Sequence, residues 1–382
     1  MAATTWRPAF SMSTREGMPI SSMVRRSASR ICAELRTRIG RLESLGYDKA
    51  QDGHEGYYSG TTGSFASLPD LCGGSLSECD GTLGGMAATV NVNGQISDQA
   101  HAVVSVFDHG FLYGEGVYET LRTYNGRPFL FDRHMRRLRN SAGMLALPVP
   151  LTDDLIEARF QDTMRAAGIA GAPGNEAYIR LMITRGVGDL SYDPAVCSTP
   201  TVVIVVKPQV DPPVDAFERG VTVALVSIVR NHPGSVNPII KSNNLLNNAI
   251  AMQEAVRRSA FEGLMRNYRG ELAECTTSNV FLVKNGTALT PPVDAGLLAG
   301  ITREFLFEVG VEQGVPVREA VLRDNDLFEA DEAFLTSTTR EIVPIVRVED
   351  RLIGAGTPGP ITKALLDAYR NRARALTQAL PA

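Results

Sequence analysis

The sequence predicts an α+β protein made of two successive domains. Three observations support this prediction. The chain has 382 residues, which is long enough for two domains with separate hydrophobic cores. From residue 88 onward, segments with the alternation typical of strands are interspersed with segments that have the roughly 3.6-residue spacing of helices. Residues 208–219, which are rich in proline and aspartate, interrupt this order as a linker between domains does.

The composition argues against several classes of function. The chain is 44% hydrophobic and 21% charged, as ordinary globular proteins are. A net charge of -4 gives no electrostatic reason to expect nucleic acid or an anionic membrane as a partner. No apolar run approaches the roughly 18 residues of a membrane span. The five cysteines are scattered and the five histidines form no ligand-spaced cluster, so we expect reduced thiols, a cytoplasmic location and no metal.

Residues 1–85 differ in composition from the rest of the chain. The first 42 residues hold eight arginines and two acids, and residues 51–85 hold nine glycines. Such a segment supports little core, so we predict a low-complexity or disordered extension. It also has the composition of an organelle transit peptide. A third interpretation, which we favour, is that the natural protein starts at Met86.

Strand and helix patterns fill the predicted first domain, residues 86–207. Asn125 and Gly126 form a dipeptide that favours two-residue hairpin turns. Pro148 follows the first helix pattern and is expected to end it. The expected elements are strands at 89–93 and 102–107, a hairpin at 116–131, helices at 132–147 and 153–167, and strands at 177–186 and 201–208.

The predicted second domain, residues 220–382, begins after the linker. Asn285 and Gly286 predict a second hairpin turn. The expected elements are a strand at 221–230, a helix from Leu245, a hairpin at 278–291, a helix after Gly300, a strand at 332–338 and a helix at 361–377.

Lys241 lies just before one of these helices, within the stretch IIKSNNLLNNAIAMQEA. Asn243 and Asn244 suit the N-cap of that helix. A lysine partly desolvated by apolar neighbours, here two isoleucines, can act as a nucleophile toward carbonyl groups or form a Schiff base. The alternative is an ordinary solvated lysine, because lysines are rarely buried.

Three other segments could form an anion site. Gly300 allows close approach of a ligand, and Ile301 and Thr302 follow it at the start of a helix whose dipole favours negative charge. In the second segment, hydroxyl groups come at the end of the buried strand expected at 332–338 and directly after it. In the third, Arg137 lies beside the core-facing Leu138 on an expected helix. None of the three segments is specific alone, and plain capping remains the alternative for the helix start and for the hydroxyl groups after the strand. The hydroxyl groups belong to Ser337, Thr338 and Thr339.

Residues 86–375 resemble the fold-type IV pyridoxal-phosphate enzymes, which include branched-chain aminotransferases, D-amino-acid aminotransferases and aminodeoxychorismate lyases. The resemblance implies a small α/β N-terminal domain and a larger C-terminal α/β domain of pseudo-barrel form. It is carried by the stretches HGFLYGEGVYETLRTYNG, HMRRL, AYIRLMITRGVGDL, IKSNNLLNNAIAMQEA, ELAECTTSNVFLVKNG, LLAGITRE, FLTSTTREIVP and GPITK.

The resemblance also implies a cofactor and the residues that hold it. Lys241 would form a Schiff base with pyridoxal 5'-phosphate and later move a proton at the substrate's alpha carbon. Glu274 matches the carboxylate that keeps the pyridine nitrogen protonated, so that the ring can accept electrons. The residues that match the family's phosphate site are Arg137, Ile301, Thr302, Ser337 and Thr338.

Substrate preference follows from the same resemblance. The residues expected at the substrate are Tyr113, Tyr118, Arg122, Tyr178, Arg180 and Thr339. Leu190 and Tyr192 stand where the D-amino-acid enzymes carry an arginine and a histidine, which argues against a D-amino-acid substrate. Tyr118-Glu119-Thr120 replaces the usual Phe-Glu-Gly, and Leu245 replaces a tyrosine, so an atypical substrate such as a chiral primary amine remains an alternative.

We therefore predict a transaminase that acts on branched-chain L-amino acids and 2-oxoglutarate and forms a homodimer or a larger homo-oligomer. The alternatives are an aminodeoxychorismate lyase and a transaminase for D-amino acids or (R)-amines. A protein that only binds the cofactor is disfavoured, because Lys241 and Glu274 are both present.

Overall fold

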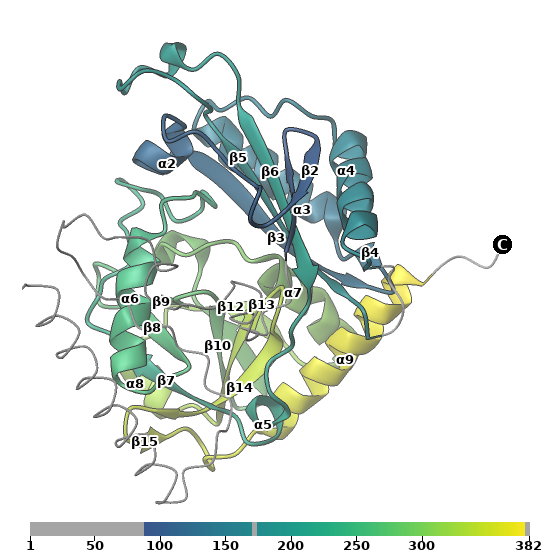
Figure 1. The fold of residues 1–382 in the computed structure, drawn as a ribbon. Coiled ribbons are helices and arrows are strands. Elements are labelled where there is room, and N and C mark those ends of the chain that lie inside the picture. Colours follow the sequence, from purple (N-terminus) through teal and green to yellow (C-terminus); the bar gives the residue numbers. More distant parts are fainter. Residues whose placement is uncertain (1–87, 170–173, 379–382) are drawn as a thin grey trace, which may run out of the picture. The chain divides into compact units, whose positions relative to one another are not determined.

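Two β-sheets organise the part of the chain that the structure describes (Figure 1). The computed structural model describes residues 88–169 and 174–378, all within one compact unit that spans Thr82–Ala382. The prediction for residues 1–85 lies outside the described residues. Helices and hydrophobic clusters pack against both sheets, so the architecture is α+β, as predicted. The predicted domain boundaries remain a prediction.

The first sheet has the order β2-β1-β6-β5-β3-β4 within the described residues, and all its pairings are antiparallel. Buried and half-buried residues alternate along β5, as expected when the two faces of an antiparallel sheet differ in burial. The strands are β1 (Thr89–Val92), β2 (Gln95–Asp98), β3 (Gly116–Tyr124), β4 (Arg127–Pro128), β5 (Ala177–Thr184) and β6 (Thr201–Pro208).

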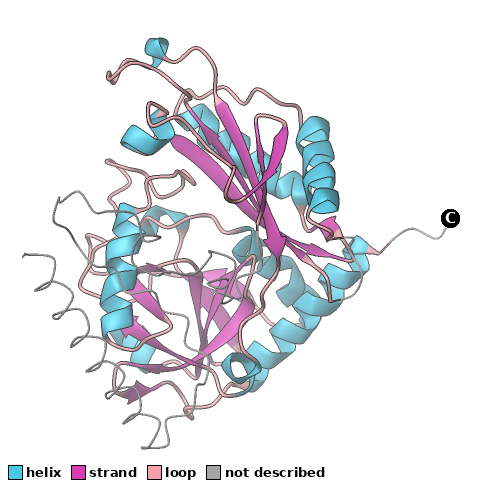
Figure 2. Cartoon of the chain, in the orientation of Figure 1, coloured by secondary structure: helices cyan, strands magenta, loops and turns pink. Residues whose placement is uncertain are grey.

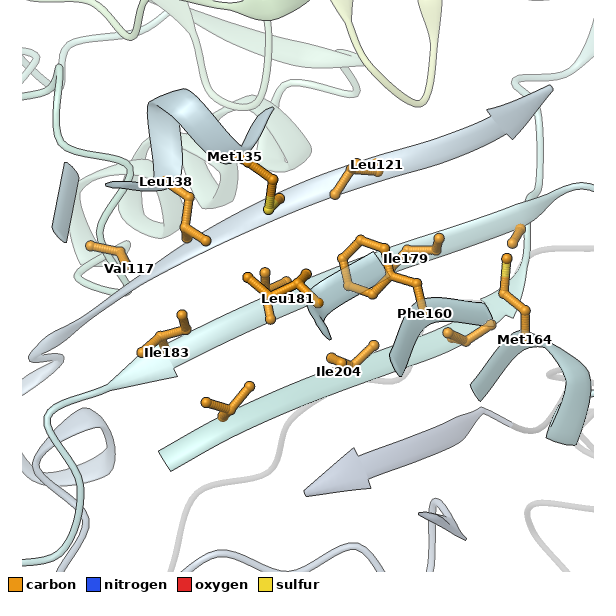
Figure 3. Packing of buried hydrophobic residues seen from close by; sticks show 14 of the residues in the cluster. Val117, Leu121, Met135, Leu138, Phe160, Met164, Ile179, Leu181, Ile183 and Ile204 are labelled. Carbon is orange, nitrogen blue, oxygen red and sulfur yellow. The ribbon is translucent and has the colours of Figure 1, made fainter. Parts of the chain in front are cut away.

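Two helices pack against this sheet, α3 (Phe131–Met144) and α4 (Asp153–Ala166). Figure 3 shows their apolar side chains over the strands: Met135 of α3 lies near Leu121 of β3, and Phe160 of α4 lies near Ile179 of β5. All four side chains are fully buried, and burial of each stabilises the fold by about 1.5–3 kcal/mol. This packing fixes α3 against β3, which positions polar residues of both elements.

The predicted turns of the two hairpins are confirmed. Asn125 and Gly126 have φ values of 51° and 72°, and Asn285 and Gly286 have 48° and 78°. Two consecutive residues with positive φ are the mark of the type I′ turn that suits the twist of a hairpin. The turns join β3 to β4 and β10 (Asn279–Lys284) to β11 (Thr287–Thr290).

The second sheet is mixed, with nine strands among the described residues. Its main path is β12-β11-β10-β13-β14-β7-β8-β9, and β15 pairs with β14. The strands are β7 (Val221–Leu225), β8 (Glu262–Arg266), β9 (Leu272–Cys275), β10 (Asn279–Lys284), β11 (Thr287–Thr290), β12 (Val317–Glu319), β13 (Glu332–Ser337), β14 (Glu341–Val348) and β15 (Arg351–Leu352).

Helices pack around the second sheet, as the cyan ribbons of Figure 2 show. Helix α6 contacts β7 and β8, and α7 packs against the long C-terminal helix α9. No helix of the described residues is long and apolar enough to cross a membrane. The remaining α-helices are α2 (His109–Tyr113), α5 (Val214–Glu218), α6 (Leu246–Arg257), α7 (Ile301–Gln313), α8 (Asp324–Phe328) and α9 (Pro360–Thr377).

Two predicted strands differ from the structure. Residues 102–107, predicted as a strand, form a loop and turn whose valines are exposed, because no neighbouring strand pairs with them. The segment predicted as a linker, residues 208–219, remains a prediction; it contains α5, which buries Ala216 and packs Phe217 against two hydrophobic clusters. The strand predicted at 221–230 ends at Leu225.

The helix after Lys241 also begins differently from the prediction. Its N-cap is Leu245, and no side chain caps it. Asn243 instead donates its backbone N–H to the carbonyl oxygen of Gly116 at 2.9 Å, so this asparagine joins the loop to β3. Asn244 lines a cavity. The expectation that these asparagines cap the helix is therefore wrong, because the N-cap is Leu245 and Asn243 instead joins the Lys241 loop to β3.

Candidate active site

A cavity of about 360 Å³ lies between the two sheets. Its lining comes from β3, β5 and α3 on one side, and from β9, the start of α7 and the end of β13 on the other. The Lys241 loop supplies a further wall. Of the thirteen residues predicted for the site, all but Tyr113 and Arg122 line this cavity: Tyr118, Arg137, Tyr178, Arg180, Lys241, Glu274, Ile301, Thr302, Ser337, Thr338 and Thr339.

Lys241 is held through its backbone, which leaves its side chain available. Its N–H donates to the Ser141 hydroxyl of α3 at 3.1 Å, and its carbonyl oxygen accepts from the N–H of Tyr118 at 2.9 Å. The Nζ atom lies 4.5 Å from the centroid of the Tyr118 ring. A half-buried amine above an aromatic face is positioned and partly desolvated, as a nucleophilic lysine requires.

Glu274 is a buried carboxylate with three protein donors. Its Oε1 accepts from Nε of Arg230 at 2.7 Å. Its Oε2 accepts from the N–H of Leu298 at 3.0 Å and from Nδ2 of Asn279 at 3.4 Å. A carboxylate has about four lone-pair sites, so one site is left for a donor in the cavity. The Arg230 guanidinium, which the sequence analysis missed, fixes the orientation of the carboxylate.

An anion-binding wall forms where α7 begins. Gly300 is the N-cap and offers no side-chain cap, so the first N–H groups of the helix lack an intrahelical partner. A Cβ on Gly300 would collide with Oδ1 of Asn279, so a larger residue here would displace this buried side chain. Nearby in the lining, the buried Ser337 hydroxyl has no partner among the described residues. These groups together suit a phosphate.

Arg137 contributes to the same anion site. It lies on α3, on the other side of the cavity, and its side chain reaches the chain just before α7. Its Nε and Nη2 donate to the two carboxylate oxygens of Glu119 at 2.8 and 2.7 Å, and its Nη1 donates to the carbonyl oxygen of Ala299 at 2.9 Å. His134 contacts the same carboxylate at 2.7 Å. Burial alone would raise the pKa of Glu119, but the charge and bonds of Arg137, with those of His134, lower that pKa to about 2. The carboxylate therefore stays ionised.

Arg180 and Tyr118 form the wall nearest Lys241. The Cζ of Arg180 lies 4.1 Å from the centroid of the Tyr118 ring. Arg180 faces Thr120 across the β3–β5 pair, so Tyr118, Thr120 and Arg180 share one sheet face. No carboxylate among the described residues pairs with Arg180, which leaves its charge available to a ligand.

The structure does not bring Arg122 or Tyr113 to the cavity. Arg122 donates from Nη1 to Asp211 at 2.9 Å and to the buried Glu341 at 3.4 Å, so protein carboxylates already neutralise it. Tyr113 ends α2, with its ring centroid 4.9 Å from that of His109 and 5.0 Å from that of Tyr192. In this chain the geometry assigns both residues to protein contacts outside the lining.

Several cavity residues carried no clear signal in the sequence. Arg230 follows β7 by a few residues, and Arg340 follows the predicted hydroxyl cluster. Arg340 donates to the fully buried carboxylate of Glu262 and to the Thr277 hydroxyl. Isolated arginines are common on surfaces, so only the fold reveals that these two line the cavity. Among the described residues no cluster of potential metal ligands is present.

These groups fit the cofactor that the resemblance implied. The anion wall offers helix N–H groups, the unpartnered Ser337 hydroxyl and Arg137 for a phosphate. Glu274 offers a carboxylate lone pair for a ring N–H group. Lys241 offers an amine on the same cavity, which suits an aldehyde. The chemistry of this donor set therefore matches pyridoxal phosphate.

Comparison with known proteins agrees with this donor set. The family described as amino-transferase class IV matches residues 116–348. A Methanocaldococcus jannaschii protein provisionally named a branched-chain-amino-acid aminotransferase is 39% identical over 282 residues, which cover 74% of this chain and 95% of that protein. A D-alanine aminotransferase of Bacillus licheniformis is 30% identical over 279 residues, which cover 73% of this chain and 95% of that protein.

Solved structures give the same family. The Escherichia coli branched-chain amino acid aminotransferase superposes with a TM-score of 0.71 at 30% identity, covering 76% of this chain and 96% of that one. The branched-chain amino acid aminotransferase of Thermobaculum terrenum, solved in its PLP-form, superposes with a TM-score of 0.67 at 29% identity. The match covers 75% of this chain and 94% of that one. The fold is thus the predicted fold-type IV. The chain belongs to the class IV aminotransferases.

Proposed function

We propose that this protein is a transaminase that moves an amino group between branched-chain L-amino acids and 2-oxoglutarate with pyridoxal 5'-phosphate as cofactor. The observation that carries the proposal is the Arg180 guanidinium, which lies in the cavity near Lys241 without a carboxylate partner among the described residues. Such a cation suits the carboxylate of an amino acid or a 2-oxo acid. Apolar side chains of the same lining suit a branched hydrocarbon group: Val236, Ile240, Leu245 and Leu298.

The cofactor would be held at three points of the cavity. Lys241 would hold it through Nζ, Glu274 would accept a hydrogen bond from its protonated ring nitrogen, and the anion wall would hold its phosphate. The residues of that wall are Arg137, Ile301, Thr302, Ser337 and Thr338. When bound, pyridoxal phosphate supplies an aldehyde that accepts the amino group and a ring that withdraws electrons from the substrate.

The chain's own residues would then perform the acid–base work. Lys241 Nζ takes the proton from the substrate's alpha carbon and later returns one, as a positioned amine can. Arg180 and Tyr178 bind and orient the substrate, and Thr339 contributes a hydroxyl at the opposite wall. The Tyr118 ring lies against the amine and would shield that side of it from water.

A D-amino-acid transaminase is the second candidate, because D-alanine aminotransferases of several bacteria are about 30–33% identical to this chain. Leu190 and Tyr192 argued against this activity in the sequence. Leu190 and Tyr192 are 70% and 89% exposed and lie outside the cavity lining, so neither would contact a substrate held in the cavity of this chain.

A donor panel tests the proposal. The purified protein would be incubated with pyridoxal phosphate, 2-oxoglutarate and one amine: L-leucine, L-isoleucine, L-valine, D-alanine or an (R)-amine. We expect glutamate to form with the three branched-chain L-amino acids. Glutamate formed from D-alanine alone would establish the second candidate. Pyruvate released from aminodeoxychorismate, without any transamination, would establish a lyase.

Replacing Arg180 with alanine is expected to raise the KM for 2-oxoglutarate by about 10- to 100-fold, because a hydrogen-bonded charge pair contributes about 1.5–3 kcal/mol. Steady-state kinetics measure this change. Lys207→Ala is the matched control, since Lys207 also lies over an aromatic ring, that of Tyr178, but outside the cavity. An unchanged KM in the Arg180 variant would remove the substrate role of this residue.

We also infer that the protein forms a homodimer or a larger homo-oligomer. An apolar patch includes Phe107, Phe111, Val187 and Leu190, each at least half exposed. The N–H of Gly188 donates to the carbonyl oxygen of Phe107 at 3.2 Å, which joins the two loops of the patch. Exposed apolar side chains on neighbouring segments are typical of an interaction site. The thiols of Cys197 and Cys275 are free, which supports our inference of a cytoplasmic location.

Placing a charge in this patch is expected to weaken the assembly. Phe111→Asp would desolvate a carboxylate at the contact, so the mass measured by light scattering should fall toward that of one chain. Val311→Asp, on the exposed face of α7, is the control and should leave the mass unchanged. A wild-type protein that already elutes as a monomer would contradict the inference.

A further inference from the structure

Glu119 is a charged residue at a core position. It lies on β3 between Val117 and Leu121, which point to the same face of the strand and belong to the first hydrophobic cluster. Its side chain is fully buried. Burying a charge costs several kcal/mol, and an apolar residue of similar volume often serves stability at least as well. The carboxylate therefore calls for a reason beyond stability.

The contacts of Glu119 fix one side chain in particular. Arg137 meets it with two parallel N–H···O bonds of 2.8 and 2.7 Å, a bidentate contact that sets the plane and direction of the guanidinium. His134, one turn earlier on α3, holds the carboxylate from the same helix at 2.7 Å. The Nε2 atom of His134 is buried without a partner among the described residues, so this histidine serves the carboxylate alone.

A count of donors shows what is left for a ligand. A guanidinium has five N–H groups. In Arg137, two bind Glu119 and a third binds the carbonyl oxygen of Ala299. One N–H remains on Nη1 and one on Nη2, which is the number that a bidentate contact to phosphate needs. Arg137 lines the cavity, whereas the carboxylate it binds does not.

We propose that Glu119 is a positioning residue that aims the two remaining N–H groups of Arg137 at the phosphate of the cofactor. The inference rests on the proposed function, because it needs a phosphorylated ligand in this cavity. Glu119 itself does not line the cavity and acts only through Arg137. Its effect should therefore appear in the preference for a phosphorylated ligand over the same ligand without phosphate.

A second trio in the chain provides a matched control. Glu115 accepts from Nε of Arg185 at 2.7 Å and contacts His109 at 3.3 Å, so it combines the same three residue types. The other nitrogens of Arg185 donate to the carbonyl oxygens of Ala146 and Leu145. Arg185 does not line the cavity. This trio holds the protein together without facing a ligand.

The experiment compares pyridoxal phosphate with pyridoxal on the full chain freed of cofactor. Dissociation constants would be measured by equilibrium dialysis for the wild type, Glu119→Gln, Glu119→Asp and Glu115→Gln. We expect Glu119→Gln to raise the dissociation constant for pyridoxal phosphate by about 10- to 100-fold. This is the size typical when a residue that orients a ligand-binding side chain is replaced. Binding of pyridoxal should not change. Glu115→Gln should alter neither constant, although both glutamine variants should melt at lower temperature.

Glu119→Asp keeps the charge and guards against a glutamine variant that does not fold. Its shorter side chain draws the guanidinium away from the cavity, so the preference for pyridoxal phosphate should fall here as well. The inference is overturned if the folded Glu119 variants keep the wild-type preference for pyridoxal phosphate over pyridoxal. It is also overturned if Glu115→Gln reduces this preference as much as Glu119→Gln does. A wild type that binds pyridoxal as tightly as pyridoxal phosphate would instead contradict the proposed cofactor.

Discussion

Replacing Lys241 with alanine is expected to slow transamination by about 10⁴-fold, the upper end of what a positioned acid–base residue contributes. The effect should be this large because the same Nζ would hold the cofactor and move the proton at the substrate's alpha carbon. The backbone contacts to Ser141 and Tyr118 do not involve the side chain, so the loop should keep its place. Single-turnover rates with L-leucine measure the loss.

The position of the cofactor can be tested on the same protein. Borohydride reduction of the wild type should attach the cofactor permanently to the peptide that contains Lys241, and the alanine variant should not be labelled there. Lys284→Ala serves as the control, because Lys284 lies at the end of β10, outside the cavity lining. A label on Lys284, or full activity in the Lys241 variant, would overturn the assignment.

Replacing Glu274 with glutamine is expected to lower kcat by about 10²–10³-fold, the range found when one preorganised electrostatic contact is removed. Glutamine keeps the size but loses the negative charge that favours a protonated ring nitrogen. The transition state gains charge in the ring, so the loss should fall on kcat more than on KM. Cofactor binding should survive, since the anion wall around Arg137 and Ser337 is unchanged.

A control close to Glu274 separates this role from a structural one. Glu271, just before β9, is also buried and accepts from Asn267 at 2.9 Å and from Arg269 at 2.6 Å, but it does not line the cavity. Glu271→Gln should lower the melting temperature without a comparable loss of kcat. If Glu274→Gln behaves like this control, Glu274 only orients Arg230 and the turn around Asn279.

The sequence by itself determined the elements that local chemistry specifies. The Asn-Gly dipeptides required type I′ turns because asparagine and glycine tolerate positive φ. Gly300 predicted the start of α7, and the apolar spacing of α3 and α4 predicted their buried faces. The linear motifs around Lys241 and Glu274 indicated the family, since their order and spacing are properties of the chain.

Tertiary structure decided which polar residues meet. Arg122 and Arg180 lie on paired strands and both suit a carboxylate, but the remote Glu341 neutralises Arg122 and leaves Arg180 to the cavity. Residues 102–107 alternate like a strand, and only the absence of a pairing partner among the described strands makes them a loop. Arg230 reaches Glu274 across 44 positions of sequence. Partners this distant leave no local pattern, because charge pairing and strand pairing depend on where the folded chain places the second group.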